Sequence, residues 1–180
     1  PARFNITEPH EISAFEKEFN KEVPVIAGGG IYSGSDIYDI MQHGAKGVKM
    51  GTRFVPTNEC DASVKFKETY VNCSEEDITI IKSPVGLPGR AIKNDFVEKI
   101  NSGETEAFKC YWKCLKSCDS KNAPYCIARA LYNASKGDLE NGFAFAGSKA
   151  HLSKRIEPVK HVIQDLKLEY YKCRIKDYFK

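Results

Sequence analysis

The start of the chain combines helical and strand-like patterns of apolar residues. From Glu8 to Asn20 the apolar residues recur at helical spacing with charges between them, which predicts an amphipathic helix. Val23 to Ala27 is a short apolar run that ends in Gly28-Gly29-Gly30. A parallel strand covered on both faces has such a composition, because the alternation of polar and apolar positions disappears. We therefore predict a buried strand that ends at a glycine turn.

A helix and a second strand follow this turn. Ser33 or Ser35 can cap a helix that ends at Gly44, since the apolar positions between them again have helical spacing. Residues 47–51 have the pattern of another short strand that runs into a second glycine turn. Strand, turn, helix, strand and turn is the order of a βαβ unit, whose strands are parallel.

The rest of the chain is predicted to be mostly helical. A helix is expected from Ala62 to Val71, then a strand or extended segment at 78–81. The stretch from Lys82 to Asn94 carries two prolines and two glycines and is expected to be a loop. After Asp95 the strand signals stop, and helices are expected over 95–101, 104–117 and 124–136 and from Pro158 onward. The predicted parts are therefore residues 1–94 and 95–180.

Composition and charge limit the classes of function. Hydrophobic residues make up 42% and charged residues 28% of the chain, with a net charge of +3, which is ordinary for a soluble globular protein. Lys and Arg alternate with Asp and Glu, which argues against a nucleic-acid partner. No apolar run approaches the roughly 18 residues that a membrane helix needs. No secretory signal is visible either, so a cytoplasmic protein without a membrane partner is expected.

The two glycine turns are the strongest candidates for chemistry. Glycine lets backbone amides approach an anion closely, and a helix that follows adds its positive end. Gly29 and Gly30 end the first predicted strand, and Gly51 and Thr52 end the second. Neighbouring parallel strands would bring these turns together into one phosphate site. The alternative is that the glycines only make tight turns.

The same segments resemble a known family. Residues 23–31 and 43–54, the latter ending in Gly51-Thr52-Arg53-Phe54, closely resemble the last two barrel strands of the nitronate monooxygenases. The FMN-dependent enoyl-acyl-carrier-protein reductases II share this pattern. The resemblance continues through 89–94 and 137–148 to the final helix, so it covers nearly the whole chain. Inosine-monophosphate dehydrogenases have a similar first turn but lack the Thr-Arg-Phe ending.

The resemblance implies a fold, a cofactor and a reaction. The fold would be α/β: the last two strands of a (β/α)₈ TIM barrel followed by a mostly helical cap, with the other strands upstream of Pro1. The cofactor would be FMN. The family's phosphate contacts match these positions: Gly29, Gly30, Lys49, Met50, Gly51 and Thr52. The reaction would be oxidation of alkyl nitronates with oxygen to a carbonyl compound and nitrite; the nearest alternative is the NAD(P)H-dependent reductase II.

Some positions depart from the family pattern. Lys49 stands where Gln is common, which leaves a side-chain contact with phosphate open, and Gly28 stands where many members have Ala. The family's catalytic His lies upstream, and its motif is matched by none of the histidines here, which are His10, His43, His151 and His161. No catalytic residue is therefore assigned. The expected partners are a small-molecule substrate, the upstream remainder of the barrel and, as an open alternative, a second copy in a homodimer.

The cysteines suggest a separate kind of site. There are seven, and an odd number argues against a disulfide framework. Four lie in or soon after the predicted helix 104–117: Cys110, Cys114, Cys118 and Cys126. A helix would align the first three on one face, and four thiolates can bind zinc or an iron–sulfur cluster. The alternatives are buried free thiols and, for the chain as a whole, a non-catalytic thiol-rich or metal-binding fragment.

Overall fold

The computed structural model describes residues 17–86, 88–111, 113, 114, 116 and 118–179. The chain divides into two compact units, of which the first is Pro1–Met50 with Lys160–Lys180 and the second is Gly51–Val159. The predicted helix that starts at Glu8 lies mostly outside the described residues, and its last residues, 17–19, are helical.

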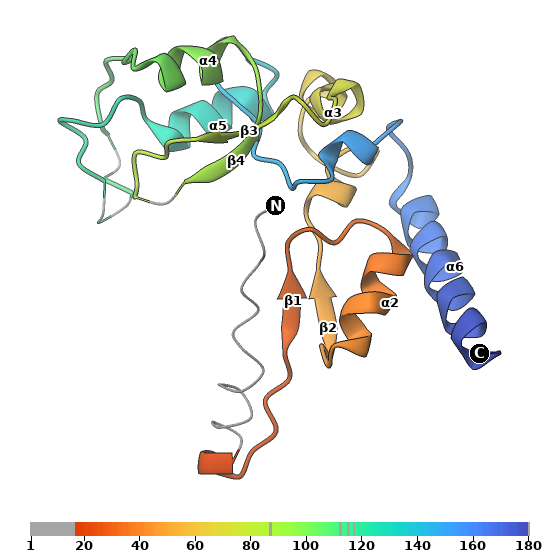
Figure 1. The fold of residues 1–180 in the computed structure, drawn as a ribbon. Coiled ribbons are helices and arrows are strands. Elements are labelled where there is room, and N and C mark those ends of the chain that lie inside the picture. Colours follow the sequence, from red (N-terminus) through yellow and green to blue (C-terminus); the bar gives the residue numbers. More distant parts are fainter. Residues whose placement is uncertain (1–16, 87, 112, 115, 117, 180) are drawn as a thin grey trace. The chain divides into compact units, whose positions relative to one another are not determined.

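The first unit contains the predicted βαβ arrangement (Figure 1). Strand β1 (Ile26–Gly28) is followed by helix α2 (Gly34–Gln42) and strand β2 (Gly47–Lys49). The two strands pair in parallel, as predicted, with Gly28 opposite Lys49. Ser33 caps α2 through a reciprocal capping box with Asp36, which stabilises such a helix by about 1 kcal/mol.

The final helix, α6 (Val159–Tyr178), packs against α2 within this unit. Gly34 is the point of closest approach, because a Cβ at this position would overlap the carbonyl oxygen of Leu166. The hydroxyl of Tyr38 donates a hydrogen bond to Asp177 at 2.7 Å, and this bond raises the pKa of Tyr38 to about 12. The glycine therefore allows the two helices to lie close together at the start of α2.

The burial predicted for the first strand is wrong for the chain as described. Ile26 is 59% exposed and Val23 is 36% exposed, although both are apolar. Among the described residues, the sheet of this unit consists of β1 and β2 alone, which is smaller than the parallel sheets whose strands are buried on both faces.

The second unit holds the remaining elements (Figure 1). In chain order they are the 3₁₀ helix η1 (Thr52–Phe54), α3 (Val64–Asn72), β3 (Ile78–Ile81), β4 (Gly89–Ile92), α4 (Asp95–Ser102), α5 (Ile127–Ser135) and the 3₁₀ helix η2 (Ala150–Leu152). Strands β3 and β4 form an antiparallel hairpin. The core of the second unit contains three packed aromatic rings: Phe96 stacks on Phe143 at 5.8 Å between ring centroids, and Tyr125 meets both rings edge-on. Burial raises the pKa of the Tyr125 hydroxyl to about 12.

Two predicted segments of this unit are wrong. The loop predicted over 82–94 contains β4, which pairs with β3. Gly89 is needed in this strand because the ring of Phe145 occupies the place of a Cβ. The helix predicted over 104–117 is absent from the described residues of that range. Lys113 has a φ of 43°, which a right-handed helix does not accommodate, and the amide of Glu106 donates to the carbonyl of Pro124 at 2.7 Å.

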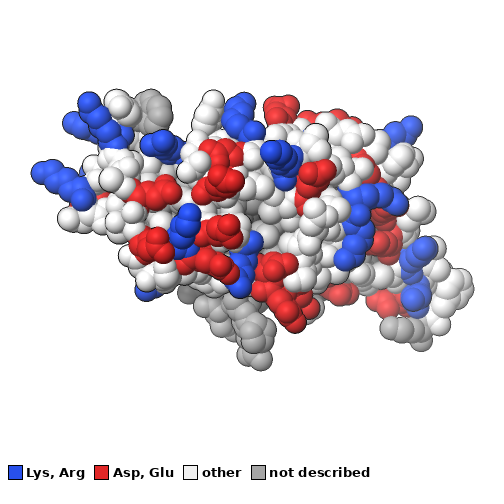
Figure 2. Space-filling model, turned by 90° about the horizontal axis from the view of Figure 1, so that it is seen from above, with Lys and Arg blue, Asp and Glu red and all other residues white. Residues whose placement is uncertain are grey.

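Two surface properties bear on the predicted partners. Within the described residues, no helix is both long enough and apolar enough to cross a membrane. On the face seen in Figure 2, acidic and basic side chains are interspersed.

Candidate functional site

The two strand tips of the first unit lie next to each other. Because Gly28 pairs with Lys49, the residues that follow, Gly29 on β1 and Met50 on β2, leave the same end of the sheet. Gly29 and Gly30 have φ values of 93° and 69°, which favour glycine over other residues. The predicted residues Gly29, Gly30, Lys49 and Met50 are thus brought together.

The amides at the start of α2 already have partners in the protein. The carboxylate of Asp36 accepts from the amides of Tyr32 and Ser33, and that of Glu169 accepts from Gly34 at 2.6 Å. An anion at the strand tips would therefore meet the tips' own backbone rather than these helix amides. The N-terminus of α2 is therefore expected to contribute less to anion binding than the sequence alone indicates.

The other two predicted residues begin the second unit. A Cβ added to Gly51 would meet no atom within 4 Å, so its backbone faces open space. The hydroxyl oxygen of Thr52 accepts a hydrogen bond from the amide of Gly147 at 2.8 Å. Gly147 has no room for a side chain there, because a Cβ would lie 2.9 Å from that oxygen. Gly147 thus fixes the side chain of Thr52, a role that no local pattern could reveal since the two residues are 95 positions apart.

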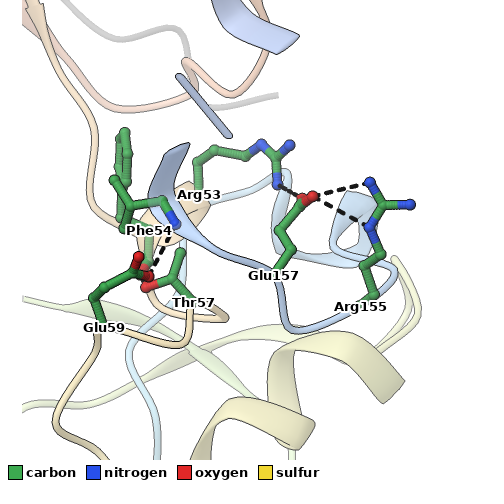
Figure 3. A network of polar contacts seen from close by, with 7 residues as sticks. Arg53, Phe54, Thr57, Glu59, Arg155 and Glu157 are labelled. Carbon is green, nitrogen blue, oxygen red and sulfur yellow. Dashed lines mark hydrogen bonds and ion pairs between the residues drawn. The ribbon is translucent and has the colours of Figure 1, made fainter. Parts of the chain in front are cut away.

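A polar network holds the segment that follows Thr52 (Figure 3). Glu157 is 5% exposed and lies between Arg53, whose Nη1 is 3.1 Å from Oε1, and Arg155, whose Nη2 is 2.9 Å from Oε2. Burial alone would raise the pKa of Glu157, but the hydrogen bonds and charges of Arg155 and Arg53 outweigh it and hold the pKa below its ordinary value. The Thr57 hydroxyl donates to the carbonyl of Phe54 at 2.8 Å. Arg53 is therefore an anchor of the turn within the second unit.

The same network fixes the chain before α6. The amide of Asn58 donates to the carbonyl of Glu157 at 3.1 Å, and the amide of Val159 donates to the Glu59 carboxylate at 2.9 Å. Thr57 and Glu157 also form an isolated parallel bridge. The residues from Thr52 to Glu59 are thus held by long-range contacts, which local sequence patterns do not predict.

The structure gives the surroundings of two histidines. The Nδ1 of His43 lies 2.7 Å from the carbonyl oxygen of Asp39 on the exposed end of α2. The Nδ1 of His151 is buried and has no hydrogen-bond partner among the described residues. His10 lies outside the described residues. No catalytic residue is assigned from this geometry.

The metal site predicted at the cysteines is not supported. Within the described part of the chain, no group of three or more His, Cys, Asp or Glu side chains is arranged to hold a metal ion. The helix that was expected to align the thiols is also absent from the described residues there. All four cysteines of the proposed set have free thiols: Cys110, Cys114, Cys118 and Cys126.

Comparison with known proteins places this geometry in a family. The family model described as "Nitronate monooxygenase" matches residues 8–169. A "Probable nitronate monooxygenase" from Staphylococcus saprophyticus is 37% identical over 84 residues, which are 47% of this chain and 24% of that protein.

Solved structures agree with this comparison. The structure of FabK from Thermotoga maritima shares 29% identity and a TM-score of 0.70, over 89% of this chain and 49% of FabK. A nitroalkane oxidase from Streptomyces ansochromogenes shares 20% identity and a TM-score of 0.65, over 88% of this chain and 42% of the oxidase. The chain thus spans less than half of these TIM-barrel proteins and has the fold of the part that it matches. The chain belongs to the nitronate monooxygenase family.

Proposed function

We propose that this chain is the flavin-phosphate-binding part of an FMN-dependent oxidoreductase that oxidises alkyl nitronates with oxygen to a carbonyl compound and nitrite. Family membership supports an oxidoreductase of the FMN type. The remaining barrel strands would come from sequence upstream of Pro1, and their packing would cover Val23 and Ile26, which are exposed in this chain.

The observation on which the proposal rests is the parallel register of β1 and β2. With Gly28 opposite Lys49, both strand tips leave the same sheet edge. In (β/α)₈ barrels, the loops that follow strands seven and eight form a phosphate site in this position. The backbone amides of Gly29, Gly30 and Met50 would donate to the phosphate oxygens.

The properties of the individual residues fit such a group. The positive φ values of Gly29 and Gly30 give the turn a conformation that presents backbone instead of side chain. The open space at Gly51 leaves its backbone accessible, and the exposed Lys49 adds a positive charge at the end of β2. Thr52, held by Gly147, completes the proposed set.

The cofactor and the residues of this chain would have different roles in the reaction. FMN, when bound, supplies the redox chemistry between the nitronate and oxygen, as cofactors do in such enzymes. This chain's residues bind and orient the phosphate end of the cofactor. The group that removes a proton from the nitroalkane is expected upstream, because no histidine here matches the family's motif.

Two adjacent glycines provide the test. An alanine at position 29 is strained at a φ of 93°, which costs about 1–3 kcal/mol. An alanine at position 28 has room, since its Cβ would lie 3.7 Å from that of Lys49. In the full-length protein, we expect Gly29→Ala to weaken FMN binding about tenfold or more, measured by quenching of flavin fluorescence. Gly28→Ala should leave the affinity within about twofold. Equal affinities of the two variants, or a wild-type protein that takes up no FMN, would contradict the proposal.

The second candidate is an FMN- and NAD(P)H-dependent enoyl-acyl-carrier-protein reductase II. The likeness to FabK, at 29% identity and a TM-score of 0.70, exceeds that to the nitroalkane oxidase, at 20% and 0.65. Anaerobic stopped-flow mixing separates the two functions. Rapid bleaching of the bound flavin by an alkyl nitronate, but not by NADH or NADPH, is expected for the monooxygenase. The reverse pattern would assign the reductase.

A further inference from the structure

The second unit contains a cavity whose wall is rich in thiols. It has a volume of about 310 Å³, and Cys110, Cys114, Cys118 and Cys126 all line it. Lys113 and Lys116 line the same cavity. All four thiols lie between α4 and α5 in the chain, with Cys126 immediately before α5. None of these cysteines and lysines belongs to the proposed flavin site.

The thiols differ in their access to solvent. Cys114 is exposed, whereas the other three cysteines of the cavity are half-buried. A dissolved hydroperoxide therefore meets Cys114 first, since oxidation of a thiol requires that the oxidant reach the sulfur. The backbone turns sharply just before it, because Lys113 adopts a left-handed φ of 43°.

Cys118 interacts with each of the other cavity thiols. It lies within electrostatic range of all three other cysteines of the cavity. Burial, followed by the neighbouring cysteines, raises the pKa of Cys118, so near neutral pH it is held as a thiol. It is thus disfavoured as the first site of oxidation, and it lines the same cavity as the exposed Cys114.

The described residues around Cys114 and Cys118 belong to no helix or strand. A disulfide needs Cα atoms roughly 4.4–6.8 Å apart, with side chains that point toward each other. No helix or strand holds the described residues from Cys110 to Cys118, so small backbone shifts there would disrupt no regular hydrogen bonding. A thiol pair in this segment can therefore adopt disulfide geometry more easily than a pair fixed on a helix.

We propose that Cys114 and Cys118 form an oxidant-driven disulfide in response to hydroperoxides. The hydroperoxide oxidises the Cys114 thiol to a sulfenic acid and is itself reduced, hydrogen peroxide to water. The sulfur of Cys118 then attacks that of Cys114, an S–S bond replaces the S–O bond, and the hydroxyl leaves with the Cys118 proton as a second water. The net reaction converts two thiols and one hydrogen peroxide into one disulfide and two waters.

Peptide mapping of the full-length protein tests the pair directly. The reduced protein is treated with equimolar hydrogen peroxide, its free thiols are alkylated, and it is digested with trypsin without reduction. Cleavage after Lys109, Lys113, Lys116 and Lys121 places the four cysteines of the cavity on separate peptides. We expect the peptides of Cys114 and Cys118 to be joined, with the mass of two hydrogen atoms lost. Cys110 and Cys126 should be recovered alkylated.

Two variants test the order of events. In Cys118→Ser, Cys114 should accumulate as a sulfenic acid that dimedone traps, because its partner is missing. In Cys173→Ser, which alters a half-buried cysteine of the first unit, the yield of the disulfide should match wild type. Recovery of all four cysteines alkylated in wild type, or of Cys114 joined to Cys110 or Cys126, would overturn the proposal.

Discussion

At the scale of single residues, Glu157 is a buried acidic side chain that forms ion pairs with two arginines. Its side chain is 6% exposed, and its carboxylate contacts the side chains of Arg53, which is 13% exposed, and Arg155, which is 69% exposed. A buried carboxylate between two guanidinium groups is stable only while both charges remain, since removal of one partner leaves a buried charge unpaired. Glu157 therefore links the stability of the turn after Thr52 to pH.

Replacement of Glu157 with Gln should destabilise the protein by about 3 kcal/mol near pH 7, because Arg53 loses its buried partner. The folded pKa of Glu157 is lowered, so its contribution is present above its ordinary value of 4.5 and is lost as pH falls through the folded pKa. The difference in unfolding free energy between wild type and Glu157→Gln should therefore shrink below about pH 4.5. Urea denaturation of both proteins at a series of pH values measures this difference in unfolding free energy.

The exposed pair of Lys93 and Glu98 serves as the control for this measurement. Their side chains are 49% and 55% exposed at a separation of 2.9 Å, so Glu98→Gln should cost less than about 1 kcal/mol. A difference for Glu157→Gln that stays constant from pH 7 down to pH 3 would show that the ion pair does not cause the loss.

At the scale of elements, the sequence predicted those whose signals are local. Helix α2 was predicted from a serine cap, apolar residues at helical spacing and a terminal glycine, all of which are local signals. The parallel pairing followed from the order strand, helix, strand. Strand β4 was missed because Pro84, Gly86 and Pro88, which precede it, and its own Gly89 are typical of a loop, whereas Gly89 serves to admit the ring of Phe145. Contacts between distant residues override local patterns in such cases, and sequence spacing does not record them.

Contacts between distant residues also explain why the helix predicted over 104–117 was wrong and why some residues near the candidate site were not predicted. Apolar spacing favoured a helix, but the amide of Glu106 bonds the distant Pro124. At the candidate flavin site, the sequence located the glycine turns, whose conformation is local. It did not find Gly147 or Glu169, which contact Thr52 and Gly34 from far along the chain.

The packing of α6 against α2 depends on the absence of a side chain at Gly34. Alanine at the first position of a helix is normally at least as favourable as glycine, so local propensity predicts no loss. We nevertheless expect Gly34→Ala to destabilise by about 2 kcal/mol, because its Cβ would overlap the Leu166 carbonyl and lie 2.6 Å from the Glu169 Cβ. Denaturation reports the total loss, and faster hydrogen exchange over 162–178 would place it in α6.

Gly51→Ala is the matched control, since a Cβ there meets no atom within 4 Å and the φ of Gly51 is −111°. Its stability should stay within about 0.5 kcal/mol of wild type. If Gly34→Ala is equally neutral, then α2 and α6 do not pack as closely as described.

At the scale of the whole molecule, the two units differ in how much of their sheet is buried. In the second unit, Ile81 and Ala91 of the hairpin are fully buried beneath α4 and α5. In the first unit, β1 presents Ile26 at 59% exposure. Amides in well-buried elements exchange near the rate of global unfolding, whereas poorly covered ones exchange through local opening. The unit that holds most of the proposed phosphate residues is thus the one whose sheet has less cover within this chain.

This difference leads to a prediction about the full-length protein with and without FMN. A ligand that binds only the folded tips stabilises them by mass action, so FMN should slow hydrogen exchange over 26–30 and 47–52. Ile81, Ala91 and Ile92 of the hairpin of β3 and β4 are already buried without a ligand, so exchange in this hairpin should change little. Hydrogen exchange with mass spectrometry can compare both regions in one experiment, and riboflavin, which lacks the phosphate, is the matched ligand. Because the proposed residues grip the phosphate, riboflavin should protect the tips much less than FMN does. Equal protection by both ligands would place the contacts elsewhere on the flavin, and protection confined to 89–102 would move the flavin site out of the first unit.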